Sequence, residues 1–400
     1  MYRKENTPMK KLIRPLPFIT AVMLLLCGCG AEQGEGGTVE SDKEFLSAKE
    51  TAKDMGLGWN LGNTMEAYKS DGCETIDYEW IPEAGDSPED YEKCWGAPVT
   101  TKEMIDGVKD AGFKTVRIPV FWGNMMENDG EWKINSEYIG RVKEIVDYCI
   151  EDDLYAVVNI HHFDEFIIRR HDLDECKEIF GKLWTQIGEY FKGYPQNLVF
   201  EGYNEYLGGD QFNENGELTP MSKEDAYQLT NELNQTFVDS VRDTGSNNKE
   251  RVLICSGYWT NIDNTTKDEF VMPTDSAKNK LMVSVHYVDN AIYWQNGIGT
   301  DNWEQYTDSQ IDLLVKAFSD NDIPVFLGET TSKYPASNFG ENAKIQDSSE
   351  CLKIILDKLT DKGFVPVLWD VSGNFYDRNA CQIADPADEA VIKEAADKLK

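Results

Sequence analysis

Basic residues are scarce in this chain of 400 residues, where 39 lysines and arginines face 72 aspartates and glutamates. The formal net charge of -33 repels nucleic acid and anionic lipid, and no basic stripe interrupts it. We therefore expect no nucleic-acid partner. An acidic surface keeps an exported protein soluble and does not disfavour a neutral polymer as a ligand.

Cysteine pairs at metal-binding spacing are also lacking. None of the nine cysteines forms a C-x-x-C motif, so a structural zinc site is not expected. Cys73 and Cys94 flank one long insertion, and the sequence leaves open whether they form a disulfide. Cys149 and Cys255 lie in apolar patterns, where buried free thiols are expected.

Long hydrophobic runs are absent except near the N-terminus. There, the run Leu16–Leu26 follows several basic residues and is too short to span a bilayer comfortably. It predicts a signal peptide over residues 1–28. No other run in the sequence is long enough to cross a membrane.

The signal segment ends in Leu26-Cys27-Gly28-Cys29, which resembles a bacterial lipobox. The resemblance implies cleavage before Cys29 and lipidation of its thiol, and an ordinary cleavage site is the alternative. The chain is then an exported cell-surface lipoprotein, held to the membrane only by this anchor. Residues 29–44 are rich in glycine and glutamate and predict a flexible tether.

Short apolar runs alternate with amphipathic stretches after the tether. The eight runs expected to form strands are Gly56–Leu61, Thr115–Pro119, Tyr155–Ile160, Leu198–Tyr203, Val252–Cys255, Leu281–His286, Pro324–Leu327 and Val365–Trp369. The stretches expected to form helices include Thr101–Ala111, Ser136–Ile150, Leu173–Lys192, Lys223–Thr244, Asp308–Asp320 and Ser348–Leu359.

This alternation predicts a single (β/α)8 TIM barrel of the α/β class over residues 45–400. A doubly wound sheet would show fewer strands and a glycine-rich phosphate loop after the first strand, and neither is found. Insertions at Tyr68–Thr100, Gly208–Ser222 and Asp289–Thr307 follow strands. They therefore belong to the C-terminal face of the barrel, where active sites form.

Two glutamates stand directly after buried strands. Glu205 follows the fourth apolar run and Glu329 follows the seventh. A carboxylate in such a place is costly unless something compensates its charge, which sets these two apart from the other acids. Two carboxyl groups are what glycoside hydrolysis needs, one to protonate the leaving oxygen and one to attack the sugar or activate water.

The motifs at the strand ends resemble those of glycoside hydrolase family 5, and more narrowly its endoglucanase branch. They are Gly58–Thr64, Phe113–Pro119, Val158–His162, Asn204-Glu205, Val283–Tyr287, Val325–Glu329 and Val367–Asp370. The resemblance covers essentially the whole chain after the tether. It implies a catalytic barrel that cuts β-1,4-glucan with retention, as an endo-β-1,4-glucanase of the cellulase type.

The same barrel also suits a cellodextrinase, xyloglucanase, lichenase, xylanase or mannanase. A non-catalytic glycan-binding lipoprotein would have lost one catalytic carboxylate, whereas both are present. The resemblance implies no cofactor, and we expect a monomer whose partner is a β-glucan polysaccharide or oligosaccharide.

The resemblance assigns roles position by position. Glu205 becomes the acid/base and Glu329 the nucleophile, with Asn204 bonding the 2-hydroxyl of the sugar. Arg117 lies beneath Glu329 and holds it ionised, since a nearby opposite charge lowers the pKa of a carboxyl. The other residues expected to bind substrate are His161, His162, His286, Tyr287 and Trp369.

Histidine and tryptophan placement agrees with this assignment. Three of the four histidines fall at predicted strand ends. A metal site would need a third ligand, and neighbouring side chains on an extended strand project to opposite sides, so we expect no metal. Aromatic faces suit pyranose rings, although packing is the alternative reading. The tryptophans near strand ends are Trp122, Trp259, Trp294 and Trp369, whereas Trp184 is expected in the core.

Two departures from the family pattern stand out. The family usually has a tyrosine two residues after the histidine of the sixth strand, where this chain has Val288 and the tyrosine is Tyr287. Strand alternation then places Tyr287 on the opposite side from His286, unless the loop bends early. The sequence therefore leaves open which group forms hydrogen bonds with the nucleophile. The proline that often follows the Asn-Glu pair is replaced by Tyr206.

Overall fold

The computed structural model describes residues 45–70, 80–205, 210–213, 215–293, 300–334, 338–339, 347–371 and 373–400. They all lie in one compact unit, Glu44–Lys400. The expected signal peptide, Cys29 and the tether fall outside the described residues, as does Cys73. Within the described part of the chain, no helix combines the length and hydrophobicity needed to cross a bilayer.

Eight parallel strands close into a barrel, so the predicted (β/α)8 fold is confirmed. Around the barrel, in chain order, they are β1 (Gly58–Asn60), β2 (Thr115–Ile118), β3 (Tyr155–Val158), β4 (Leu198–Glu201), β7 (Leu253–Ser256), β8 (Leu281–His286), β9 (Val325–Thr330) and β10 (Val365–Leu368). Each of the eight predicted runs overlaps one of them, with ends that differ by up to three residues. The ring closes where Gly58 and Trp59 of β1 pair with Val367 and Leu368 of β10.

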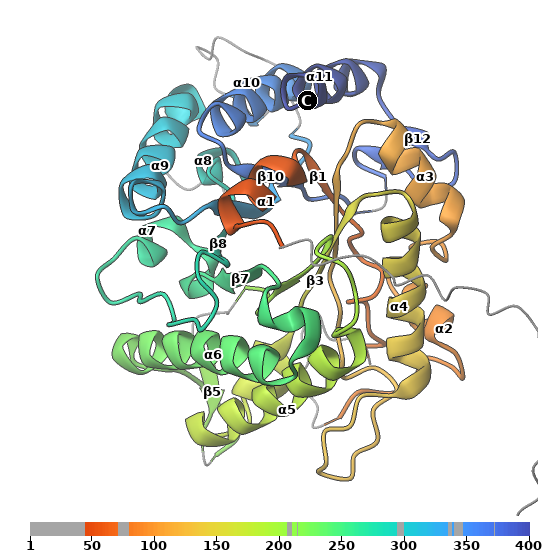
Figure 1. Cartoon of the computed structure of the whole chain (residues 1–400), viewed down its shortest axis with the longest axis vertical. Coiled ribbons are helices and arrows are strands. Elements are labelled where there is room, and N and C mark those ends of the chain that lie inside the picture. The colour runs from red at the N-terminus through yellow and green to blue at the C-terminus, as the bar shows by residue number, and fades with distance from the viewer. Residues whose placement is uncertain are drawn as a thin grey trace, which may run out of the picture. The chain divides into compact units, whose positions relative to one another are not determined.

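Helices surround the barrel, and one follows each strand (Figure 1). They are α3 (Lys102–Asp110), α4 (Ser136–Glu151), α5 (Leu173–Phe191), α6 (Lys223–Asp243), α7 (Ile262–Thr265), α9 (Trp303–Ala317), α10 (Ser348–Asp361) and α11 (Pro386–Lys398). Polar side chains fix their starts. Asn135 accepts hydrogen bonds from the first backbone amides of α4, and Asp172 forms a capping box with Glu175 at α5.

Shorter elements fill the connections. The helical ones are α1 (Ala48–Met55), α2 (Pro88–Glu92), η1 (Asp164–Ile168), η2 (Ser246–Lys249), η3 (Tyr258–Thr260), α8 (Asn290–Tyr293), η4 (Thr300–Asn302) and η5 (Ser319–Asn321). Two antiparallel hairpins were not predicted from the sequence. They are β5 (Asp210–Phe212) with β6 (Leu218–Pro220), and β11 (Tyr376–Asp377) with β12 (Gln382–Ile383).

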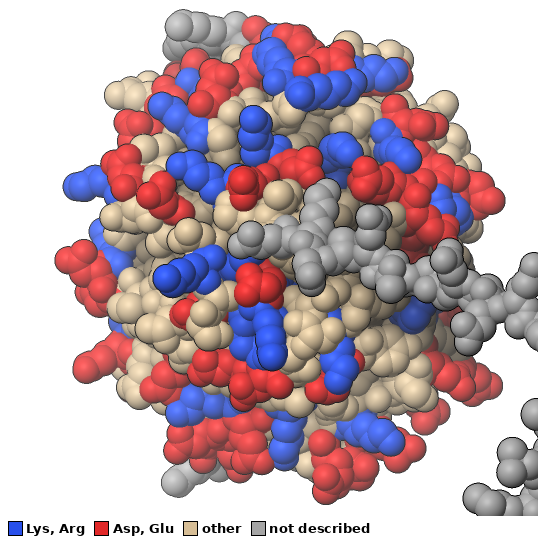
Figure 2. All heavy atoms as spheres, viewed as in Figure 1, with Lys and Arg blue, Asp and Glu red and all other residues tan. Residues whose placement is uncertain are grey.

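Helix α1 closes the N-terminal end of the barrel, and Figure 1 looks onto this end with α1 across its centre. Its residues Ala48, Ala52 and Met55 join a cluster of buried apolar side chains that point inward from the strands. The other members lie on the strands or, for Val252, directly before one, and are Tyr155, Val157, Val199, Val252, Ile254, Met282, Phe326, Val365 and Val367. The half of the barrel interior near α1 is therefore apolar. Acidic and basic side chains are interspersed over the outer surface in the same view (Figure 2).

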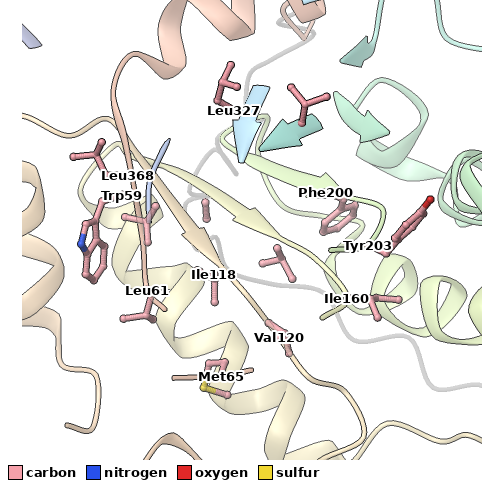
Figure 3. Close-up of a cluster of buried hydrophobic side chains, with 14 of the residues drawn as sticks. Trp59, Leu61, Met65, Ile118, Val120, Ile160, Phe200, Tyr203, Leu327 and Leu368 are labelled. Atoms are coloured by element: carbon pink, nitrogen blue, oxygen red, sulfur yellow. The ribbon is translucent and has the colours of Figure 1, made fainter. Parts of the chain in front are cut away.

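A second and larger apolar layer packs the outward faces of the strands against the helices. Figure 3 shows part of this layer, including Trp59, Leu61, Ile118, Val120, Ile160, Phe200, Leu327 and Leu368. Trp184 of α5 is fully buried there, as predicted, with its ring centroid 4.5 Å from that of Phe237 on α6. Cys149 and Cys255 are buried free thiols, also as predicted, and Cys94 forms no disulfide with a described residue.

Candidate active site

Polar side chains replace apolar ones at the inward positions nearer the C-terminal end of the barrel. Glu201 follows Val199 by two residues on β4, and Ser284 follows Met282 by two residues on β8, so strand alternation points both inward. Asn60, Arg117 and Asn159 lie at the same level of the barrel and form hydrogen bonds there. All five side chains of this polar layer are buried. The barrel therefore supports a charged site on an apolar base.

Arg117 is the centre of this layer. Its Nε donates to Oε2 of Glu201 at 2.7 Å, and its Nη1 donates to Oε1 of Glu329 and to Oδ1 of Asn60, both at 3.0 Å. Its Nη2 donates to Oδ1 of Asn204 at 2.7 Å. Burial opposes the charge of the guanidinium, but the two carboxylates outweigh it and raise the pKa of Arg117. The arginine is therefore a fixed cation beneath the site.

Glu329 lies on β9 with only 5% of its surface exposed. Burial raises the pKa of this carboxyl, and the neighbouring Glu205 acts in the same direction. His286, Arg117 and the hydroxyl of Tyr287 oppose the rise. Both oxygens accept a hydrogen bond, one from Arg117 and one from Tyr287, so the group has the partners that an ionised nucleophile needs.

Tyr287 lies on the same side as Glu329, because the loop bends early, which is the alternative that the sequence left open. Its Oη donates to Oε2 of Glu329 at 3.0 Å. Tyr287 follows the last residue of β8 and has a φ of 47°, in the left-handed region. Strand alternation therefore ends at His286, and the turn brings the next side chain back to the site. Val288 is fully buried instead.

Glu205 lies four residues after the last residue of β4, beside His286. Its side chain is 31% exposed, and Nδ1 of His286 lies 2.8 Å from its Oε1. The same nitrogen lies 3.8 Å from Oε2 of Glu329. One oxygen of each carboxylate and the histidine nitrogen all lie within 4.8 Å of one another. A retaining glycosidase places its carboxyl groups about 5–5.5 Å apart, and this spacing agrees with such a pair.

A metal ion fits this trio poorly, although the spacing alone allows one. Glu329 already accepts hydrogen bonds from the Arg117 guanidinium at 3.0 Å and from the Tyr287 hydroxyl. A bound cation would have to displace these donors and would lie next to a fixed positive charge. The donor set therefore suits two carboxylates that act on a neutral substrate.

The predicted histidines have different surroundings in the structure. His161 is buried, with Nδ1 3.2 Å from the side-chain nitrogen of Asn159, and burial holds its pKa well below the usual value. His162 has a φ of 56° and turns toward an aromatic cluster. Its ring makes edge contacts with those of Tyr68, Trp95 and Phe121. Burial lowers the pKa of His162 to about 4, so the ring is neutral at neutral pH.

The tryptophans near strand ends also differ in burial. Trp369 is half-buried. A Cβ on Gly62 would lie 2.6 Å from the carbonyl oxygen of Asp370 and 3.2 Å from the Trp369 ring, so the glycine leaves room for both. Trp122 is buried, and its Nε1 donates to the carbonyl of Asn159, which makes it a packing residue. Trp259 is 43% exposed on the loop after β7. Trp294 falls outside the described residues.

Sequence reasoning missed Glu201, Asn60, Asn159 and Ser284. A usable signal was present, because each is a lone polar residue within or directly after an apolar run expected to be a buried strand. Such residues face a polar interior or a partner when the strand is buried on both sides.

The family model for cellulase, glycosyl hydrolase family 5, matches residues 72–375. Among curated proteins, the chain is 35% identical over 335 residues to endoglucanase A of Clostridium longisporum, covering 81% of this chain and 59% of that protein. It is 30% identical to endoglucanase A of Ruminococcus albus, covering 88% of this chain and 93% of that protein.

A solved structure with the same fold is a family 5 enzyme from Prevotella bryantii in complex with a xyloglucan tetradecasaccharide. It is 31% identical with a TM-score of 0.72, covering 88% of this chain and 99% of that one. The family model spans well over half of the chain, and the barrel carries its carboxylate pair at the expected strand ends. The chain therefore belongs to the cellulase family, glycosyl hydrolase family 5.

Proposed function

We propose that the chain hydrolyses internal β-1,4-glucosidic bonds with retention, with Glu205 as acid/base and Glu329 as nucleophile. The observation that carries this is the pairing of two carboxylates in unlike surroundings. Glu329 is buried and anchored by Arg117 and Tyr287, whereas Glu205 is partly exposed beside His286. The first suits a fixed nucleophile, and the second suits a group that exchanges protons with the leaving group and water.

In the first step, an oxygen of Glu329 attacks the anomeric carbon while the bond to the leaving oxygen breaks. Glu205 gives its proton to that oxygen, and a glycosyl ester forms on Glu329. In the second step, Glu205 takes a proton from water, whose oxygen attacks the anomeric carbon. Glu329 leaves as a carboxylate, so both groups return to their starting state and the product keeps its configuration.

Asn204 is oriented for the 2-hydroxyl of the sugar. Its Oδ1 is held by Nη2 of Arg117 at 2.7 Å. The side-chain amide nitrogen is thereby left to donate to a hydroxyl of the substrate. Arg117 thus sets the direction of Asn204 and holds the nucleophile at the same time.

The proposed substrate is a β-1,4-glucan, as the names of the curated relatives indicate. Endoglucanases from Clostridium longisporum and Ruminococcus albus match most of this chain. A similar solved structure is that of a broad specificity endoglucanase from Clostridium longisporum. Initial rates on carboxymethylcellulose, mixed-linkage glucan, xyloglucan, xylan and mannan decide between this proposal and the alternatives. We expect a rapid fall in viscosity on carboxymethylcellulose, whereas release of cellobiose alone would identify a cellodextrinase.

The catalytic roles are tested by two substitutions. E329A should abolish turnover but keep oligosaccharide binding, because the sugar contacts of Asn204 and Trp369 remain. E205A should form the glycosyl ester much faster from substrates with good leaving groups than from natural glucan, because such leaving groups need no protonation. Hydrolysis of the ester should be slow with both, because the base that activates water is also lost. Proton NMR of the first product formed should show the β-anomer. An α-anomer, or substantial hydrolysis by E329A, contradicts the assignment.

We also propose that the enzyme is exported and anchored at the cell surface through Cys29. The motif Leu26-Cys27-Gly28-Cys29 and the basic, apolar segment before it support this. C29A should move the activity from the membrane fraction to the soluble exported fraction, with C27A as the matched control. Equal membrane retention of both variants contradicts lipidation at Cys29.

A further inference from the structure

Arg117 has two carboxylate partners, and only one of them belongs to the proposed catalytic pair. We propose that Glu201 is a positioning residue that shares Arg117 with Glu329, fixing the guanidinium beneath the nucleophile while withholding part of its charge. The inference rests on the proposed role of Glu329. It concerns how the charge of the nucleophile is set rather than which residue attacks.

The contacts of Glu201 are those of an ionised carboxylate. Its Oε2 accepts from Nε of Arg117 at 2.7 Å and from Nδ2 of Asn159 at 3.1 Å. Its Oε1 accepts from Oγ of Ser284 at 2.7 Å. Three donors converge on this fully buried side chain, and none of these three contacts requires the carboxyl group to donate a proton. Glu201 is therefore held from β2, from β8 and from the residue directly after β3.

The geometry divides the guanidinium between the two acids. Nε points to Glu201, and Nη1 points to Glu329. The arginine cannot move toward either carboxylate without lengthening its bond to the other. One positive charge thus serves two buried negative charges, so Glu329 is less stabilised as an anion than it would be by an undivided arginine.

A nucleophile gains from this arrangement. The nucleophile must be ionised at the working pH. Strong stabilisation of its negative charge, however, makes it a weaker nucleophile, because this stabilisation is lost when the ester forms. The division of Arg117 keeps Glu329 oriented without holding its charge too tightly.

Other charged and titratable groups also face Glu329, and the test must leave them unchanged. Glu205, His286 and Tyr287 act on it beside Arg117, and Glu201 is the second acid at Arg117. Of these, Glu201 is an acid at some remove from the reacting atoms, with Arg117 between it and Glu329. Its charge can therefore be removed without touching the proposed catalytic pair.

E201Q removes the charge with almost no change of shape. The amide oxygen can take the place of Oε2 and accept from Arg117 and Asn159, and the amide nitrogen can donate to the hydroxyl of Ser284. The measurement is the pH profile of kcat/KM. We expect its acid limb to move to lower pH by about one unit, because Glu329 then receives the whole charge of Arg117. We also expect kcat to fall about tenfold with KM little changed.

S284A is the matched control, because it removes a hydrogen bond from Glu201 and leaves every charge in place. It should lower kcat several-fold without moving the acid limb. An unmoved or raised acid limb in folded E201Q overturns the sharing of charge. Wild-type kcat in S284A overturns the positioning role, and this result is decisive even where E201Q does not fold. Turnover by E329A would instead overturn the proposed function, so the two failures are distinguishable.

Discussion

The hydroxyl of Tyr287 donates to Oε2 of Glu329 across a distance of 3.0 Å. The contact depends on a left-handed backbone at Tyr287, with a φ of 47°, directly after the last residue of β8. A tyrosine in this conformation is uncommon and is kept only where the surroundings require it. The position of this ring is therefore tied to the site rather than to packing alone.

Y287F should raise the pKa of Glu329, because the tyrosine hydroxyl stabilises the ionised carboxylate and phenylalanine has no hydroxyl. A carboxylate with a higher pKa becomes protonated at higher pH. The acid limb of kcat/KM is then expected to move up by about one unit, with kcat reduced about tenfold. The shift is opposite in sign to that expected for E201Q.

Y194F is the control for this substitution. Tyr194 donates to Oδ1 of Asp147 at 2.6 Å, on the helical side of the barrel before β4. Loss of its hydroxyl should leave the pH profile in place. Equal profiles for Y287F and the wild-type enzyme would mean that Tyr287 does not influence the charge of Glu329.

Gly328 carries a bulge that brings Glu329 level with His286. Val285 of β8 pairs with Leu327, but His286 pairs with Glu329, so β9 has one extra residue at this point. A Cβ on Gly328 would lie 2.9 Å from Nε2 of His286 and 3.0 Å from Oε1 of Glu201.

G328A should therefore displace both groups. We expect a loss of about 1–3 kcal/mol in stability, as for other overpacked cores, with a larger proportional loss of kcat. Thermal unfolding and initial rates measure the two effects. G140A is the control, since its Cβ would meet nothing within 4 Å on α4, and alanine is the better helix former. A G328A enzyme as active as G140A contradicts the proposed crowding.

Glu66 makes stability depend on pH from a place outside the catalytic pair. It is buried, accepts from the backbone amide of Thr64 at 2.9 Å, and burial raises its pKa from 4.5 to about 7. The folded state thus binds a proton that the unfolded state has released between these values. The contribution to stability is fully present below pH 4.5 and is lost as the pH rises through about 7.

E66Q should flatten this part of the stability curve. From the shift, the wild-type enzyme should lose about 3 kcal/mol from this group between pH 4.5 and pH 8, and the variant should not. Denaturant unfolding at several pH values measures the difference. Parallel curves for the two proteins would mean that folding does not raise the pKa of Glu66.

The barrel and the carboxylate pair were predictable because their signals are local. Apolar runs of strand length alternate with amphipathic helices, and Glu205 and Glu329 directly follow two of those runs. Parallel strands in a closed barrel bring such ends together, so linear order was enough to place them on one face. Trp184 was predicted in the core for the same kind of reason, its helical spacing with apolar neighbours.

The side of the strand on which Tyr287 lies was not predictable by alternation, because that rule stops at a backbone turn. The turn depends on a tertiary contact with β9, where the amide of Tyr287 donates to the carbonyl of Glu329 at 2.9 Å. Glu201 is recognisable in the sequence as a lone polar residue in an apolar run, but the role proposed for it could not be predicted. Its partners Arg117, Asn159 and Ser284 lie on or directly after other strands, and only closure of the barrel shows that they meet.

Trp184 links the helical layer to the strand that leads to the acid/base. Its Nε1 donates to the carbonyl of Gly202 at 2.9 Å, one residue beyond Glu201. W184F keeps an aromatic ring but leaves this buried carbonyl without its donor, which should cost about 1–3 kcal/mol. The smaller ring also leaves a space beside Phe237, so the loss of stability should lie toward the upper end of this range.

W132F is the matched control, since Trp132 is half-buried in a loop and packs against Trp80 and Phe166. Thermal unfolding should show a clear drop for W184F and a small one for W132F. Because Gly202 lies between Glu201 and the Asn204-Glu205 pair, W184F should also lower kcat. W132F should leave kcat unchanged, because Trp132 packs against Trp80 and Phe166 in its loop. Equal stability of the two variants would mean that the bond to Gly202 contributes little to the barrel, and the strand would then owe its position to apolar packing alone.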